Sequence, residues 1–262
     1  MHSLAKNKTD TGVHALCNTA HVDIQNSCNG IYNPSIVCKD VNRYLTKCRH
    51  DIRLLEFVPV KETFHARHVA TQRKYIYRFM IPKVSTNHQL PLIEKSHTHC
   101  FRDKNFDIER MKRGARLFLG TKDFKTFSAS PKTKTNLLYR RTIDEFTVEK
   151  SHPLMPMDPL SQNYEFWQVL CSSRSFLYNQ VRRMVTALLH LGAGYITERD
   201  INCMLQVPNH QNWIRHLPLV PPSGLHLINV EYSQETLDKY IIKCKPTTPN
   251  NPIVKPIDLD ET

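Results

Sequence analysis

Hydrophobic and polar residues alternate most regularly in the segment from Arg73 to Ile81. One side of an extended chain here would carry Tyr75, Tyr77, Phe79 and Ile81. This two-residue period predicts a β-strand. Shorter runs of the same kind predict further strands near residues 20–24, 52–58, 143–148, 165–171 and 225–232.

A period of 3.6 residues predicts the strongest helix over Ser175–Leu191. On a helical wheel started at Leu177, one arc is apolar and contains Val181, Met184, Val185 and Leu188. Arg182 lies at the edge of this arc, where it can reach a cleft, whereas Arg183 points away toward phosphate or solvent. Cap residues and apolar spacing predict three more helices, at about 35–45, 108–119 and 197–205.

Strands and helices interleave without the regular βαβ rhythm of a doubly wound sheet, which favours an α+β fold with a mixed sheet. The 262 residues are enough for one large domain or two fused halves. Only seven glycines are present, and neither a dinucleotide-binding G-x-G-x-x-G nor a P-loop occurs. We therefore expect no nucleotide cofactor. The sequence contains no run of about 18 apolar residues, so it predicts no membrane span.

The charge balance points to a polyanionic partner, because 36 Lys and Arg face 24 Asp and Glu and give a net charge of +12. The eight cysteines contain no C-x-x-C pair, so we expect reduced, mostly buried thiols. The run His97-Thr98-His99-Cys100 invites a metal hypothesis, since alternate residues of a strand share a face. No second ligand cluster follows at zinc-site spacing, so we expect no metal and discount a zinc-dependent enzyme.

The most informative stretch is Lys8-Thr9-Asp10-Thr11-Gly12-Val13-His14-Ala15. Its carboxylate, Asp10, lies on a tight loop at the head of a predicted strand, where backbone on both sides can aim it at a ligand. Asp and Gly are also the commonest turn residues, so this motif alone indicates only a turn.

Later motifs change that interpretation. The stretch 8–15 resembles the catalytic-loop signature of the TruA-type tRNA pseudouridine synthases, and further stretches resemble the same family in the same order. These are Phe64-His65-Ala66-Arg67-His68 running to Tyr75, Leu119–Phe124, Phe176–Met184, and Gly224-Leu225-His226-Leu227. The resemblance spans roughly residues 8–232 and is specific, because the motifs occur in register.

The resemblance implies a pseudouridine synthase fold, with two ferredoxin-like halves whose sheets meet across a central cleft. The N-terminal half would be residues 1–95 and the C-terminal half residues 96–243, followed by a disordered Pro-rich tail at 244–262. Relatives carry a leading strand and helix before the catalytic loop. Met1–Asn7 is too short to supply them, so we expect this strand and helix to be missing.

The resemblance also implies the roles of four residues. Asp10 would be the essential catalytic acid, Tyr75 would stack on a flipped-out uridine, and Arg182 would be the active-site arginine. Lys8 stands where relatives have an arginine that helps to displace the target nucleotide. No cofactor and no metal are implied.

We therefore expect an isomerase that converts uridine to pseudouridine in tRNA or other structured RNA. The alternative is a non-catalytic RNA-binding or ribosome-associated protein that has kept the scaffold. Bacterial relatives are homodimers, which makes a homodimer possible here. Similarity to eukaryotic members of the family favours a mitochondrial location.

Overall fold

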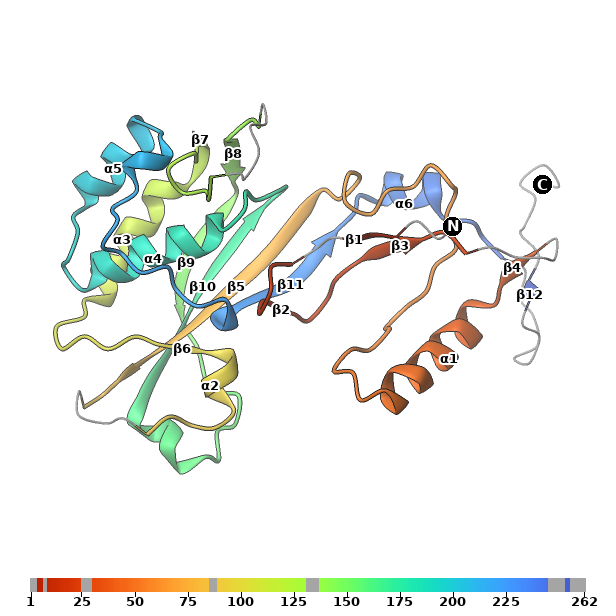
Figure 1. Cartoon of the computed structure of the whole chain (residues 1–262), viewed down its shortest axis with the longest axis horizontal. Coiled ribbons are helices and arrows are strands. Elements are labelled where there is room, and N and C mark those ends of the chain that lie inside the picture. The colour runs from red at the N-terminus through yellow and green to blue at the C-terminus, as the bar shows by residue number, and fades with distance from the viewer. Residues whose placement is uncertain are drawn as a thin grey trace. The chain divides into compact units, whose positions relative to one another are not determined.

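The computed structural model describes residues 4–6, 9–24, 30–84, 89–130, 137–244 and 253–254 (Figure 1). The chain folds into two compact units. The first contains residues 1–7, 19–69 and 232–262, and the second contains residues 8–18 and 70–231. These units are compact groups of residues and are not the two halves of the family fold. The expected division into halves at residue 95 therefore stays a prediction.

A mixed sheet of six strands, counted over the described residues, is the centre of the second unit. Its order is β2-β11-β5-β10-β9, with β6 also paired to β5. Strand β2 runs parallel to β11 and β6 parallel to β5, whereas the other pairs are antiparallel. The strands are β2 His14–Ala15, β5 Gln72–Pro82, β6 His99–Cys100, β9 Glu145–Lys150, β10 Tyr164–Ser173 and β11 Leu225–Glu231.

Helices α3 and α4 pack against this sheet and against each other (Figure 1). The helices and short 3-10 turns of the unit are α2 Glu94–His97, α3 Ile108–Ala115, η1 Arg116–Phe118, η2 Pro159–Asn163, α4 Gln180–Gly192, α5 Glu198–Gln206, η3 His210–Asn212 and η4 Pro222–Gly224. A separate antiparallel pair is formed by β7 Gly120–Asp123 and β8 Arg140–Ile143.

The core confirms the alternation seen in β5. Tyr77 and Phe79 are fully buried in the main cluster, and Tyr75 and Ile81 pack against it. The apolar arc of α4 is buried as expected, including Met184, Val185 and Leu188. An α+β class with a mixed sheet is therefore confirmed.

Helix starts follow their capping residues. Thr197 and Asp200 form a capping box at α5, and Asp107 caps α3, as expected from the sequence. The first predicted helix is α1 Pro34–Lys47, but its cap is Asn33 rather than Ser35, because the Asn33 side chain accepts from the Ser35 N–H. Helix α4 begins at Gln180, five residues later than predicted, since Asn179 takes a left-handed conformation (φ 60°).

The first unit contains α1, α6 Gln234–Tyr240 and two small antiparallel pairs. One pair is β1 Leu4–Lys6 with β3 Ala20–Val22, and the other is β4 Ile31–Tyr32 with β12 Ile253–Val254. Most of the tail predicted to be disordered, 244–262, lies outside the described residues.

Two expectations about this unit and the cysteines are wrong. Residues 52–58 form no strand, because Leu54 is instead bound at both its N–H and its carbonyl by the Asn42 side chain. Of the seven cysteines in the described part of the chain, all are free but only Cys171 is buried. Among the described residues, no helix is both long and apolar enough to cross a bilayer.

Candidate active site

The Asp10 loop is a tight turn fixed at the edge of the six-stranded sheet. The Val13 N–H donates to the Asp10 carbonyl at 3.1 Å, and Gly12 has a φ of +80°, which is the value that a type II turn requires at its third residue. A Cβ atom on Gly12 would lie 3.0 Å from Cγ of Pro222 in η4. Glycine is therefore needed at position 12 both for this backbone conformation and for the close approach to Pro222. Asp10 lies half-buried at the start of the turn.

Strand β2 continues directly from this turn and holds it in register. His14 pairs with His226 and Ala15 with Leu227 of β11, and the Leu16 N–H donates to the Leu227 carbonyl at 2.8 Å. Tyr75 of β5 lies opposite Leu227 on the other side of β11. The catalytic-loop motif and Tyr75 thus belong to neighbouring parts of the same sheet.

Tyr75 presents a half-buried ring beside Phe176, whose ring centroid lies 5.4 Å away in an edge-to-face arrangement. Burial raises the pKa of the Tyr75 hydroxyl to about 12, the Arg73 charge opposes this shift, and the Asp10 charge adds to it. At neutral pH the phenol is therefore protonated and can donate a hydrogen bond, but it cannot accept a proton as a base.

Arg182 projects from the first turn of α4. Its Nε donates to the Val220 carbonyl at 2.9 Å and its Nη1 to Oδ1 of Asn179 at 3.1 Å. Burial lowers the pKa of the guanidinium from its ordinary value, while Tyr77, Asp10 and Tyr178 act in the opposite direction. The residue is held at a fixed position and stays charged at neutral pH.

The Asp10 charge contributes to the pKa shifts of both Tyr75 and Arg182, so the three side chains, which come from segments far apart in the chain, lie within electrostatic range of one another. Lys8, the fourth predicted site residue, lies outside the described residues.

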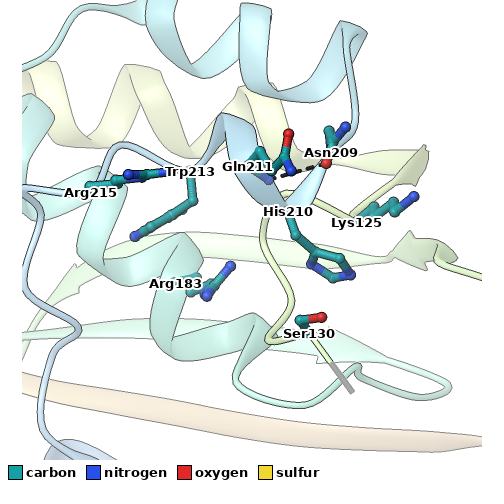
Figure 2. A pocket seen from close by; sticks show the side chains of 8 residues that line it. All are labelled: Lys125, Ser130, Arg183, Asn209, His210, Gln211, Trp213 and Arg215. Carbon is teal, nitrogen blue, oxygen red and sulfur yellow. Dashed lines mark hydrogen bonds between the residues drawn. The ribbon is translucent and has the colours of Figure 1, made fainter. Parts of the chain in front are cut away.

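Arg183, predicted to meet phosphate or solvent, is held by the protein. Its Nη1 donates to the carbonyls of Thr126 and Ser128 at 2.8 and 2.7 Å, and the guanidinium stacks on Trp213 at 4.9 Å from the ring centroid. Figure 2 shows this pair among the side chains that line a pocket. The volume of the pocket is about 470 Å³. The lining residues are Lys125, Ser130, Arg183, Asn209, His210, Gln211, Trp213 and Arg215. Several are cationic, so the pocket suits an anionic group.

Sequence reasoning missed the residues that position Arg182. Asn179 takes the left-handed conformation that Asn tolerates better than most residues, and its side chain then faces the arginine. Asn179 lies inside the predicted helix 175–191, so the sequence carried no signal for this role. The Val220 carbonyl has no side-chain signature and could not have been found.

Comparisons with known proteins place the chain in a class of RNA-modifying enzymes, and it belongs to the tRNA pseudouridine synthase family. The family model described as tRNA pseudouridine synthase matches residues 115–233.

Individual relatives cover more of the chain. It is similar to tRNA pseudouridine synthase-like 1 of Mus musculus, with 35% identity over 231 residues, which is 86% of this chain and 76% of the relative. The protein of the same name from Xenopus laevis is 31% identical over 234 residues, covering 89% of this chain and 76% of the relative. A bacterial relative, tRNA pseudouridine synthase A of Dinoroseobacter shibae, is 31% identical over 232 residues, covering 88% and 80%.

Proposed function

We propose that this protein isomerises uridine to pseudouridine in tRNA and that Asp10 is its essential catalytic residue. The observation that carries the proposal is the placement of the Asp10 turn at the edge of the sheet that also carries Tyr75, with β11 between them, while Arg182 of α4 lies within electrostatic range of Asp10. These are the acid, the aromatic residue and the cation that a flipped-out uridine would require.

The reaction breaks one bond to the ribose and forms another. The bond from C1′ to N1 of uracil is cleaved, the base turns, and C5 bonds to C1′. C5 then loses its proton and N1 gains one, so that substrate and product have the same composition. Cleavage generates positive charge at C1′, which a carboxylate can stabilise or trap.

Asp10 can act in three ways: as a nucleophile on the sugar, as a nucleophile on the base, or as a charge stabiliser. Each requires the ionised carboxylate. The Arg182 guanidinium favours that form because a nearby positive charge stabilises an anion. Arg182 is itself fixed by Val220 and Asn179, so it provides this charge without having to reorganise.

Tyr75 would hold the target base out of the RNA stack. Its ring offers a stacking face next to Phe176, and its protonated hydroxyl can donate to the uracil or to a reacting oxygen. Lys8, one residue before Thr9, would assist displacement of the nucleotide with its charge but without the planar fork of an arginine.

Binding of tRNA is supported by the net charge of +12 and by the pocket of Lys125, Arg183 and Arg215, which suits a phosphate group. We further infer the two ferredoxin-like halves of the family fold, a possible homodimer and a mitochondrial location. Sedimentation velocity and imaging of the tagged protein in cells would test the last two.

The direct test uses tRNA labelled with tritium at uridine C5, because pseudouridine formation releases that tritium. We expect Asp10→Asn to abolish release while tRNA binding stays close to that of the wild type. The matched control is Asp144→Asn, the same substitution at an exposed position of the same unit. Equal release by wild type and Asp10→Asn would remove Asp10 from its assigned role.

The alternative is a non-catalytic RNA-binding or ribosome-associated protein. Mapping pseudouridine in RNA from cells that lack the protein separates the two functions. Loss of defined sites is expected of the enzyme, and an unchanged map would favour the RNA-binding protein.

A further inference from the structure

Three histidines from distant segments meet at the edge of the six-stranded sheet. They are His14 in β2, His97 at the end of α2 and His226 in β11, and one ring nitrogen from each lies within 4.8 Å of the others. The His14 ring is 4.4 Å from that of His97 and 4.8 Å from that of His226, centroid to centroid. All three belong to the second unit.

The backbone holds two of these rings in one tautomer. Nε2 of His14 lies 2.9 Å from the Ser96 carbonyl, and Nδ1 of His226 lies 3.0 Å from the Gly224 carbonyl. A carbonyl only accepts hydrogen bonds, so these nitrogens carry the hydrogen. The other nitrogens, Nδ1 of His14 and Nε2 of His226, keep their lone pairs. This is the arrangement found around metal-binding histidines, whose second N–H is commonly held by a backbone carbonyl.

Neutral imidazole is the form that binds a metal ion. His97 lies three residues after the carboxylate of Glu94. Glu94 is itself engaged by Arg78, Thr98 and the Leu154 N–H, so it belongs to a neighbouring network.

We propose that His14, His97 and His226 bind one divalent transition-metal ion, of which Zn²⁺ is the best match. Imidazole suits zinc, whereas magnesium and calcium prefer oxygen ligands. Three histidines with a water molecule would complete a tetrahedral shell. His226 is buried, but His14 and His97 are half-exposed and leave room for an ion to enter.

The distances agree with this assignment after a small closure. With zinc–nitrogen bonds of about 2.0–2.1 Å, tetrahedral ligand atoms lie roughly 3.4 Å apart. The present separations of up to 4.8 Å would therefore shrink by at most about 1.4 Å. This closure requires the half-exposed His14 and His97 side chains to rotate, and it requires His14 to turn out of its stacked position on His226, where the interplanar angle is 20°.

The bound ion would join β2, α2 and β11 and so fix the turn that carries Asp10 four residues earlier. This effect on Asp10 rests on the proposed function, whereas metal binding itself does not. A protein that binds zinc but forms no pseudouridine would remove the proposed function and leave this site in place.

The experiment uses the full chain without a histidine tag, freed of metal by chelation and then titrated with Zn²⁺ against a chromophoric chelator. We expect one equivalent to bind with a Kd of about 1 µM or below and to raise the Tm. His97→Asn should weaken binding by about 100-fold. The control His152→Asn, an exposed histidine of the same unit, should bind as the wild type does.

X-ray absorption at the zinc edge tests the wild-type protein without relying on any variant. We expect about three imidazole nitrogens at about 2.0–2.1 Å from the metal. Sulfur ligands, a shell without imidazole, substoichiometric binding, or equal affinity of the wild type and folded His97→Asn would each overturn the proposal.

Discussion

Arg182 and Arg183 are consecutive in α4, but their guanidinium groups are bound by different parts of the chain. Arg182 donates to Val220 and Asn179 and is coupled to Asp10. Arg183 donates to Thr126 and Ser128 and stacks on Trp213 in the basic pocket. One turn of helix thus supplies a cation to the candidate active site and another to a candidate phosphate site.

We expect substitution of Arg182 to impair mainly catalysis and substitution of Arg183 to impair mainly tRNA binding. Arg182→Ala removes the fixed charge beside Asp10 and should lower kcat by about 10²–10³-fold, as does the loss of other preorganised electrostatic groups. Arg183→Ala should leave kcat within about 10-fold and weaken tRNA binding, most strongly at low salt. Single-turnover tritium release and filter binding would measure the two effects, and an equal loss of kcat in both variants would contradict this division.

Tyr75 should act mainly through its ring. Tyr75→Ala removes the stacking surface for the base and should reduce kcat/KM roughly 10- to 100-fold, which corresponds to the 1–3 kcal/mol of a base–aromatic stack. Tyr75→Phe keeps that surface and isolates the hydroxyl, whose raised pKa excludes a role as a base at neutral pH. Rates of tritium release for both variants test the role of the ring. If Tyr75→Phe were as impaired as Tyr75→Ala, the main role would belong to the hydroxyl.

Gly12→Ala should impair activity more than stability. Alanine at a φ of +80° costs about 1–2 kcal/mol, and its Cβ would also press on Pro222 and displace the Asp10 loop. Gly120→Ala is the matched control, because Gly120 has a φ of +82° but its Cβ would lie 4.0 Å from its nearest neighbour, the Lys122 amino group. Urea denaturation should show similar losses of stability, with activity lost only in Gly12→Ala.

Glu94 and Arg78 form a buried ion pair at 3.5 Å that ties α2 to β5. Glu94→Ala leaves the Arg78 charge buried without this partner and should lower the free energy of unfolding by about 3–5 kcal/mol. The control Glu109→Ala breaks an exposed pair with Lys112 and should cost only about 0–1 kcal/mol. Chemical denaturation measures both, and comparable losses would argue against a buried charge as the cause.

The sequence predicted the regular elements well where one local rule dominated. The alternation of β5 and the capping box of α5 depend on residues only a few positions apart, and both are confirmed. The segment 52–58 has strand-like residues but finds no partner strand, because Asn42 binds the Leu54 backbone instead. Pairing over a distance decides a strand, and composition alone does not reveal it.

The candidate site was accessible from sequence only through family motifs. Periodicity placed Arg182 at the border of the core, but nothing local indicated that Asn179 and Val220 would hold it. The histidine cluster was missed for the same reason. The metal hypothesis for His97 and His99 required one continuous strand over both residues. Instead, His97 ends α2, and its ring lies near His14 and His226, which are distant in the chain.

The pairing of β2 with β11 also has a consequence for the order of folding. His14 and His226 are about 200 positions apart, and a polypeptide is synthesised at about 5–20 residues per second. The segment bearing Asp10 therefore leaves the ribosomal tunnel roughly 10–40 s before its partner strand does. Until then β2 lacks the strand with which it pairs in the sheet.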